Sequence, residues 1–473
     1  MTSTSPTRLI VGPFNRVEGD LEVTLDVADG VVRDARVTAP LYRGFEQILA
    51  GRPPEDALVI APRICGICSV SQSVAAARAL AQVAGVEMPA NGRLAADLVL
   101  ACENAADHLT HFVLFFMPDF ARAAYAGRRW HEAAVRRFAA GRGEAQHALV
   151  PARARFLHVM GLLAGKWPHS LAIQPGGTTK SVDAGERVRL LSILAEFREA
   201  LETIVFADRL ERVAALDSVA ALEAWADAAP LDRGDFRLFL HIARDLELER
   251  LGRGPGAFLS HGSFDLWPAG VVMDGASLPY DPAQVAEDLT HAWMDGPTKP
   301  DADKDGAYSW CKAPRLGGRV VEVGALARQM VASDPLAVDL VARSGGAVKD
   351  RVVMRMVELA RLVLAMEGWV RGFRLNQPFC VDSPLPLRGS GIGLTEAARG
   401  ALGHWLHLES GAIDSYQIIA PTTWNFSPRD AAGTPGPLEQ ALAGTPIQPG
   451  ETTPVAVQHV VRSFDPCMVC TVH

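Results

Sequence analysis

Two pairs of cysteines, one near each end of the sequence, constrain the fold more than any other feature. Cys65 and Cys68 stand in the stretch RICGIC, and Cys467 and Cys470 stand in DPCMVC, close to the last residue. Two residues between cysteines allow both sulfurs to reach one ion, and four thiolates suffice for a tetrahedral soft-metal site. If the four share one site, the chain of 473 residues must bring its two ends together.

Spacing alone leaves other uses of these cysteines open. A structural zinc site usually has its second pair within about 20 residues of the first, whereas here most of the chain lies between them. A thioredoxin-like redox pair needs one CxxC motif beside a βαβ pattern, and buried cysteines can be inert. A metal site and buried or redox cysteines are therefore both compatible with the spacing.

Composition excludes several classes of protein. Hydrophobic residues make up 49% and charged residues 21%, which is typical of a well-packed globular chain. The net charge is −8 and no basic run is present, so nucleic acid is not an expected partner. No stretch approaches the roughly 18 apolar residues of a membrane span, and no leader opens the chain. Seven cysteines in so long a chain do not suggest a disulfide scaffold, so we expect a cytoplasmic protein.

The N-terminal sequence favours an antiparallel sheet. Apolar and polar residues alternate over 21–27, and Asp29-Gly30 is a turn signal before apolar residues resume. Helical stretches are expected at residues 71–83, 93–116, 151–163, 183–229, 319–332 and 350–371. Residues 296–306 favour a loop, and residues 427–454 an ordered irregular segment. We expect a single α+β domain over residues 1–473, predominantly helical, with a small N-terminal antiparallel sheet.

The sequence around the cysteines, and a series of further motifs along the chain, narrow the possible protein class. These are RVEG (16–19), RGFE (43–46), GKWPH (165–169) with GG (176–177), YSWCKAPR (308–315) with EVG (322–324), RGAL (399–402), PTTWN (421–425) and SPRD (427–430). Together with RICGIC and DPCMVCTVH, this set closely resembles the large, catalytic subunit of [NiFe]-hydrogenases. The resemblance implies that family's fold, with a central helix bundle, and heterolytic cleavage of H2.

The resemblance also assigns the metal ligands. It implies that all four cysteines bind nickel, with Cys65 and Cys467 as terminal ligands. Cys68 and Cys470 would also bridge to an iron that carries CO and CN. Cleavage of H2 needs a metal that accepts hydride and a base that accepts the proton. Thiolates suit soft metals, and a thiolate such as Cys467 can also act as the base.

Five further residues match family positions around that centre. By the resemblance, Glu18 matches the proton acceptor beside a terminal cysteine, and a carboxyl in a dry pocket suits that role because its pKa is raised. Arg399 matches the arginine above the metals, with Asp107 and Asp465 around it, and Thr422 matches a hydroxyl that hydrogen-bonds cyanide. Without the resemblance, these residues would be interpreted as a surface glutamate, a helix-surface aspartate and turn residues.

A second ion is implied by the same resemblance. Glu46, His473 and the carbonyl of Ile418 match the protein ligands of a magnesium site, which water would complete. Histidine is an unusual ligand for magnesium, so only the resemblance supports it.

His108 and His111 stand three apart on one helical face and could bind a metal. We favour the interpretation that they are hydrogen-bonded residues of the core.

Departures from the family pattern point to one subclass. Gln72 stands where many hydrogenases have histidine, and Ala398 where proline is usual. Bulky Ile67 and Phe115 match two positions that narrow the gas route. The sequence ends at His473, without an extension for a maturation protease. These features resemble the regulatory, hydrogen-sensing subclass with low turnover, although a trimmed mature chain would end there too. The alternatives are an energy-conserving uptake hydrogenase and a non-catalytic relative such as the quinone-site subunit of NADH dehydrogenase, which lacks the four cysteines.

The remaining cysteines imply a partner. Cys102, Cys311 and Cys380 do not form an iron–sulfur motif. Electrons from a buried centre therefore need iron–sulfur clusters in another chain, and we expect a heterodimer with a small iron–sulfur subunit. A dimer of heterodimers and a histidine-kinase partner are further expectations of the sensing subclass.

Overall fold

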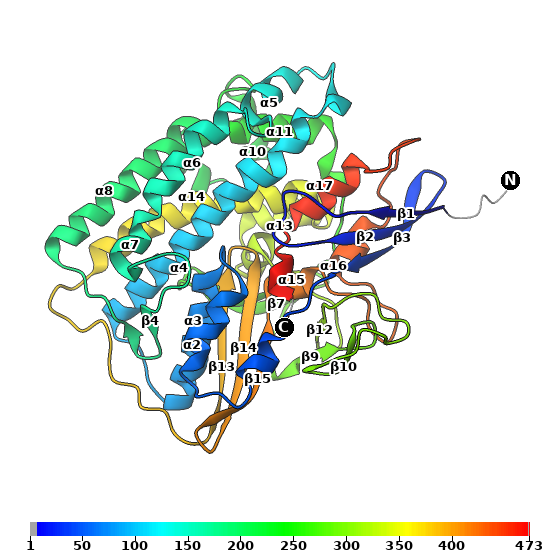
Figure 1. Ribbon diagram of the computed structural model, residues 1–473. Coiled ribbons are helices and arrows are strands. Elements are labelled where there is room, and N and C mark those ends of the chain that lie inside the picture. The colour runs from blue at the N-terminus through cyan, green and yellow to red at the C-terminus, as the bar shows by residue number, and fades with distance from the viewer. Residues whose placement is uncertain (1–6, 472) are drawn as a thin grey trace.

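The computed structural model describes residues 7–471 and 473, and its long helices form a bundle on one side of the molecule, with the sheets on the other (Figure 1). The long helices are α4 (Ala90–Thr110), α6 (Glu144–Phe156), α8 (Ala184–Ala200) and α14 (Val348–Gly372). Helix α14 packs against α4 and α8, and most of its side chains are buried, including charged ones. Burial on nearly every face marks α14 as the core helix, and its charges therefore need partners inside the protein.

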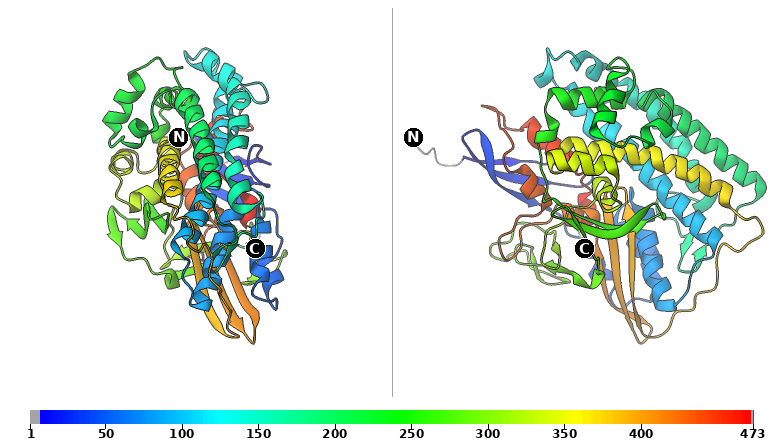
Figure 2. Two further views of the ribbon diagram at one scale, coloured as in Figure 1. Left: turned by 90° about the vertical axis from the view of Figure 1, so that its left-hand side faces the viewer. Right: turned by 180° about the vertical axis from the view of Figure 1, so that it is seen from behind.

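A three-stranded antiparallel sheet supports the helix that follows the first cysteine pair. Its strands are β13 (Gly389–Ala397), β14 (Gly400–Glu409) and β15 (Ala412–Ile419), and the helix is α3 (Ser69–Ala84). A Cβ at Gly393 would lie 1.8 Å from the carbonyl oxygen of Ala75, and one at Gly391 would lie 2.1 Å from that of Ala79. The strand therefore needs glycine where the alanine-rich helix touches it. This packing places the start of α3 beside the end of β13 (Figures 1 and 2).

The expected N-terminal hairpin is present. Strands β1 (Thr7–Val11), β2 (Glu22–Ala28) and β3 (Val31–Thr38) form an antiparallel sheet, with β2 in the middle. Asp29 and Gly30 both have positive φ and make the turn between β2 and β3. Glu18 lies four residues before β2, so this sheet anchors the segment that carries it.

Shorter elements connect these layers. The remaining helices are α1 (Phe45–Leu49), α2 (Asp56–Ile60), α5 (His131–Phe138), α7 (His158–Ala164), α9 (Leu210–Ala214), α10 (Val219–Asp227), α11 (Asp235–Asp245), α12 (Ala325–Val331), α13 (Pro335–Ser344), α15 (Pro421–Asn425), α16 (Pro437–Leu442) and α17 (Val455–Ser463). The remaining strands are β4 (Ile173–Gln174), β5 (Gly177–Thr178), β6 (Ala257–Ser263), β7 (Trp267–Met273), β8 (Ala276–Leu278), β9 (Val285–Asp288), β10 (Met294–Gly296), β11 (Lys299–Pro300) and β12 (Ala313–Leu316). Strands β6, β7 and β8 form another three-stranded sheet, and the other pairs are β4–β5, β9–β12 and β10–β11.

Several expected helices are wrong in extent. The stretch 183–229 divides into α8, a π-helical turn, α9 and α10, and the Ser218 side chain accepts from Ala221 N–H at 3.2 Å to start α10 anew. The stretch 151–163 divides into α6 and α7, and 319–332 is helical only in α12. The expected loop at 296–306 is only partly a loop, because it includes the end of β10 and all of β11, which pair as a small hairpin, and α16 interrupts the irregular segment. In the described part of the chain, no helix is long and apolar enough to cross a bilayer.

Candidate metal centre

The four cysteines from the two ends of the chain meet in the interior. The sulfurs of Cys65 and Cys467 are 3.4 Å apart, those of Cys68 and Cys470 are 3.1 Å apart, and those of Cys467 and Cys470 are 3.0 Å apart. All four sulfurs lie within 4.8 Å of one another, and all four residues are buried and free of disulfides. Four converging sulfurs in a dry site fit soft metal ions.

Local structure explains how each pair is aimed. Cys65 ends the 3-10 turn Ala61–Ile64, and Cys68 immediately precedes α3. Cys470 lies in the 3-10 turn Met468–Thr471. Each pair therefore spans a tight turn, so its two side chains point the same way. The N–H of Cys470 donates to the carbonyl of Cys467 at 3.0 Å and closes the second turn.

The segment that carries Glu18 is bonded to the second cysteine pair through its main chain. The N–H of Met468 donates to the carbonyl of Glu18 at 2.7 Å, and Glu18 N–H donates to the carbonyl of Pro466 at 3.4 Å. The next residue, Gly19, has φ +80°, and a Cβ there would lie 3.0 Å from Val469. Glycine is therefore required at the fourth position of RVEG.

The Glu18 carboxyl is half-buried beside the thiols. Burial, and then the negative charge of Cys65, raise the pKa of Glu18, while Arg399 and Arg43 lower it less. A carboxyl with a raised pKa beside the sulfur of Cys65 is suited to take up and release a proton.

Arg399 lies above the cysteines in the two-residue turn between β13 and β14. Its guanidinium donates to both carboxylate oxygens of Asp107 at 2.6 and 3.2 Å, and to a carboxylate oxygen of Asp465 at 3.1 Å. Burial disfavours this charge, but attraction to Asp107 and Asp465 raises the pKa of Arg399 well above its ordinary value. The side chain is thus held charged and in a fixed orientation.

Thr422 also lies at the centre. Its hydroxyl oxygen accepts the N–H of Cys467 at 3.2 Å, so the residue fixes the backbone of Cys467. Because that bond uses the oxygen as acceptor, the hydroxyl proton is free to donate to another group. This geometry is compatible with the expected hydrogen bond to cyanide.

Glu46 and His473, two residues of the expected magnesium site, both lie near Lys312. Glu46 is buried, and its carboxylate accepts from Lys312 Nζ at 2.7 Å and from Ile418 N–H at 2.8 Å. Lys312 also pairs with Glu287 at 2.9 Å. Both ring nitrogens of His473 are buried without a partner among the described residues, and burial lowers the pKa of that ring well below 6.5. Motif matching missed Lys312 and Glu287, although Lys312 stands within YSWCKAPR.

His473 can serve as a ligand through one nitrogen only, because a neutral imidazole has one nitrogen with a lone pair and one that carries a proton and needs an acceptor. At Glu46, the ammonium of Lys312 contacts the oxygen that a cation would need.

The interpretation of the two helical histidines as core residues agrees with the structure. His108 Nε2 lies 2.9 Å from Glu358, and His111 Nε2 lies 2.6 Å from the carbonyl of Arg462. Both rings are buried, and each has its own hydrogen-bond partner in the core.

Ile67 and Phe115 are both half-buried. Ile67 lies between the first two cysteines, and Phe115 lies in a π-helical turn, His111–Phe116, that continues α4. The carbonyl of Phe115 accepts from the Arg16 guanidinium at 3.0 Å, which links this turn to the RVEG motif.

Gln72 belongs to a buried series of hydrogen bonds that the sequence motifs did not predict. His404 Nε2 lies 2.7 Å from the carboxamide oxygen of Gln72, and His404 Nδ1 lies 2.8 Å from the Tyr416 hydroxyl. Burial lowers the pKa of His404 to about 3, so the ring is neutral. No sequence motif contains His404 or Tyr416, and only the pairing of β14 with β15 brings them together.

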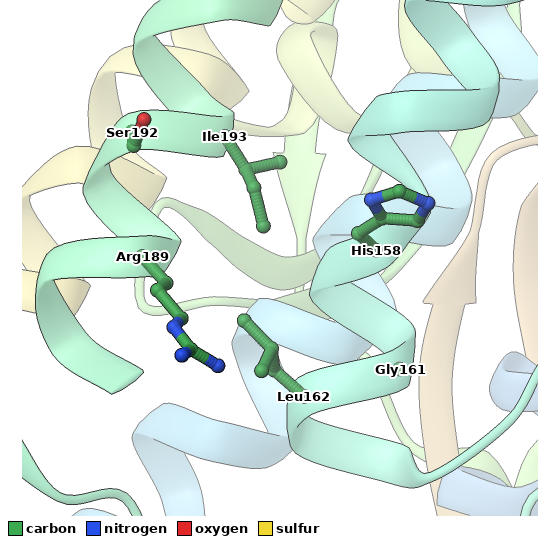
Figure 3. Close-up of a pocket in the computed structure, with 6 residues that line it drawn as sticks. All are labelled: His158, Gly161, Leu162, Arg189, Ser192 and Ile193. Atoms are coloured by element: carbon green, nitrogen blue, oxygen red, sulfur yellow. The ribbon is translucent and has the colours of Figure 1, made fainter. Parts of the chain in front are cut away.

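Figure 3 shows a hollow between α7 and α8. It has a volume of about 440 Å³ and is lined by His158, Gly161, Leu162, Arg189, Ser192 and Ile193. None of the site residues described above lines it.

Comparison with known proteins agrees with this geometry. A model of the nickel-dependent hydrogenase family matches residues 43–129 and 147–473. The large subunit of the periplasmic [NiFeSe] hydrogenase of Desulfomicrobium baculatum is 30% identical over 516 residues, covering 98% of this chain and 95% of that protein. The Hydrogenase-2 large chain of Escherichia coli K12 is 27% identical over 575 residues, covering 98% and 97%. The reduced [NiFeSe] hydrogenase of Desulfovibrio vulgaris Hildenborough matches with a TM-score of 0.83 at 28% identity, covering 99% of this chain and 100% of that one.

The chain belongs to the nickel-dependent hydrogenase family. The resemblance seen in the sequence, the fold class with its helix bundle, and the enzyme class are confirmed. The non-catalytic alternative is not supported, because the four cysteines converge and the family match extends over most of the chain.

Proposed function

We propose that this chain is the large subunit of a two-subunit [NiFe]-hydrogenase of the hydrogen-sensing kind, which cleaves H2 heterolytically at low turnover. The observation that carries the proposal is the buried set of four sulfurs within 4.8 Å of one another. Cys65, Cys68, Cys467 and Cys470 would hold nickel, and Cys68 and Cys470 would also hold an iron with CO and CN ligands. When bound, the two metals would supply a hydride acceptor.

The surrounding residues then have separate roles. The raised pKa of Glu18 suits it to accept the proton near Cys65. The fixed charge of Arg399, held by Asp107 and Asp465, orients a small diatomic molecule or cyanide above the metals. The hydroxyl of Thr422 donates its free proton in a hydrogen bond to the cyanide ligand.

The magnesium site is part of this proposal. His473, Glu46 and the carbonyl of Ile418 would hold the ion, with water completing its shell. The support is the unpaired, buried ring of His473. Lys312 would have to yield the carboxylate oxygen of Glu46, so the ion and the lysine compete for one position.

A small iron–sulfur subunit is the proposed partner. Within the described residues, the four-cysteine centre is the only metal-ligand cluster of three or more His, Cys, Asp or Glu side chains. The other three cysteines therefore do not add a cluster for electrons. Val17, Ile67 and Val469 beside the centre are only half-buried, which leaves an apolar surface that a second subunit would cover. The same proposal includes a single domain for this chain. It also includes pairing in a heterodimer and association of two such heterodimers.

The sensing subclass is supported by Gln72, which cannot titrate, and by the bulk of Ile67 and Phe115. A histidine kinase would be the signalling partner of such a protein. The uptake alternative has the same metal centre and differs in flux. The cytoplasmic location stays a prediction, and one relative is a periplasmic enzyme.

The test uses the purified two-subunit protein. We expect infrared bands of CO and CN, exchange between D2 and solvent protons, and slow hydrogen oxidation that continues in air. Fast oxidation that stops in air would instead favour the uptake hydrogenase. Absence of the CO and CN bands in protein that is active in exchange would contradict the proposed centre.

A further inference from the structure

The hairpin that joins β6 and β7 forms a pocket that the metal centre does not use. The pocket has a volume of about 460 Å³, and its wall consists of residues 261–269 and Arg78 of α3. Two side chains in this wall are more than nine-tenths buried yet carry polar atoms without a hydrogen-bond partner in the part of the chain described: Nε2 of His261 and Oγ of Ser263. Buried polar atoms are rarely left unpaired, so each requires an explanation.

The tautomer of His261 follows from its other nitrogen. Nδ1 lies 3.2 Å from the carbonyl oxygen of Leu402, and a carbonyl can only accept, so Nδ1 carries the proton. Burial lowers the pKa of His261 to about 4, so the ring is neutral at pH 7. Nε2 therefore presents a lone pair and needs a hydrogen-bond donor.

Arg78 brings a positive charge to the same pocket. Its guanidinium donates to the carbonyl of Leu394 at 2.7 Å and pairs with no carboxylate among the residues described. Burial lowers the pKa of Arg78, but a guanidinium stays charged at pH 7. Asp265 also lines the pocket, and it is exposed to solvent. The carboxylates of Asp97 and Asp265 lie near enough to attract this charge, and Arg93 lies near enough to repel it.

The turn holds these groups in place. Phe264 and Asp265 both have left-handed backbones, with φ of 64° and 55°, which bulky residues rarely adopt. The Phe264 ring stacks on Trp369 at 5.5 Å and packs edge-on against Trp267, so the hairpin tip is fixed to the helix bundle. The pocket is therefore preorganised for a ligand.

We propose that this pocket binds a small monoanion that carries an O–H group, such as hydrogen carbonate or dihydrogen phosphate. The negative oxygen pairs with Arg78, the hydroxyl of Ser263 donates to the ligand, and the ligand donates its own O–H to Nε2 of His261. Asp265 disfavours a second negative charge. This arrangement gives Nε2 of His261 and Oγ of Ser263 a partner each, whereas chloride has no proton to donate to the imidazole.

The test is calorimetric titration of the purified two-subunit protein at pH 7 with sodium hydrogen carbonate, with sodium phosphate and with sodium chloride. We expect saturable binding of one or both oxyanions and no binding of chloride. Comparison of the two oxyanions then shows which of them the pocket prefers. Ser263→Ala removes one hydrogen bond and should weaken binding about three- to tenfold. Arg78→Met should abolish it.

Arg93→Met is the matched control, because it removes the same charge nearby from a residue outside the pocket wall. It should bind like the parent. An equal loss of oxyanion affinity in Arg78→Met and Arg93→Met, or an affinity in Ser263→Ala equal to that of the parent, would show an adventitious ion only. No saturable heat with either oxyanion would show that the pocket holds water alone. If Arg78→Met does not fold, Ser263→Ala decides, because no protein hydrogen bond is lost with that hydroxyl.

Discussion

Glu18→Gln tests whether the carboxyl beside Cys65 carries the proton. The amide keeps the volume and the hydrogen-bonding groups but cannot titrate. Both contacts between residue 18 and the second cysteine pair are main-chain hydrogen bonds, so the substitution leaves them intact. The metal centre should therefore assemble normally, and only proton transfer should change.

The size of the effect follows from the role. Loss of a positioned acid or base costs about 10²–10⁴-fold in rate, or about 3–5 kcal/mol of barrier. The assay is exchange between D2 and solvent protons, with nickel content and infrared bands measured on the same sample. Glu22→Gln is the matched control, because it makes the same change four residues along, on β2, and it should exchange like the parent. Parent-level exchange by a fully assembled Glu18→Gln variant would refute the reasoning and assign the proton to another group.

Three further predictions concern the surroundings of the centre. Arg399→Lys keeps the charge but loses the two-pronged contact, so exchange should fall while nickel stays bound; parent-level exchange would show that orientation does not matter. Ile67→Val with Phe115→Leu should make hydrogen oxidation oxygen-sensitive while anaerobic activity survives, at a cost near 1 kcal/mol for the first change; unchanged oxygen tolerance in assembled protein contradicts a narrowed gas route. Burial opposes the charge of Glu358, but Arg328 lowers its pKa to about 2, below the roughly 4.3 of an unfolded chain. Its stabilisation is therefore present above about pH 4.3 and lost as the pH falls toward 2, so the Glu358→Gln penalty in thermal midpoint should shrink over that window; a penalty independent of pH would contradict this.

The sequence was most informative where chemistry or turn geometry fixes a residue. The four cysteines are few and placed in recognisable turns, and the Asp29-Gly30 turn determined the first hairpin. Helix α14 was predicted almost to its ends, because one long apolar pattern runs without a break.

The sheet of β13, β14 and β15 was missed for a physical reason. Glycine in a strand weakens the expected alternation, and here Gly391 and Gly393 are present so that α3 can touch the strand. That contact depends on residues more than 300 positions apart, which no local pattern shows. The turn that carries Arg399, and the chain of His404 with Gln72, depend on the same sheet.

The central claim is that the two cysteine pairs form one nickel–iron site. Anomalous X-ray diffraction at the nickel and iron edges from crystals of the two-subunit protein tests it directly. We predict one nickel peak among the four sulfurs and one iron peak beside it, on the side of Cys68 and Cys470. A single zinc peak among the sulfurs, or nickel and iron bound elsewhere in protein that is active in exchange, would contradict the account.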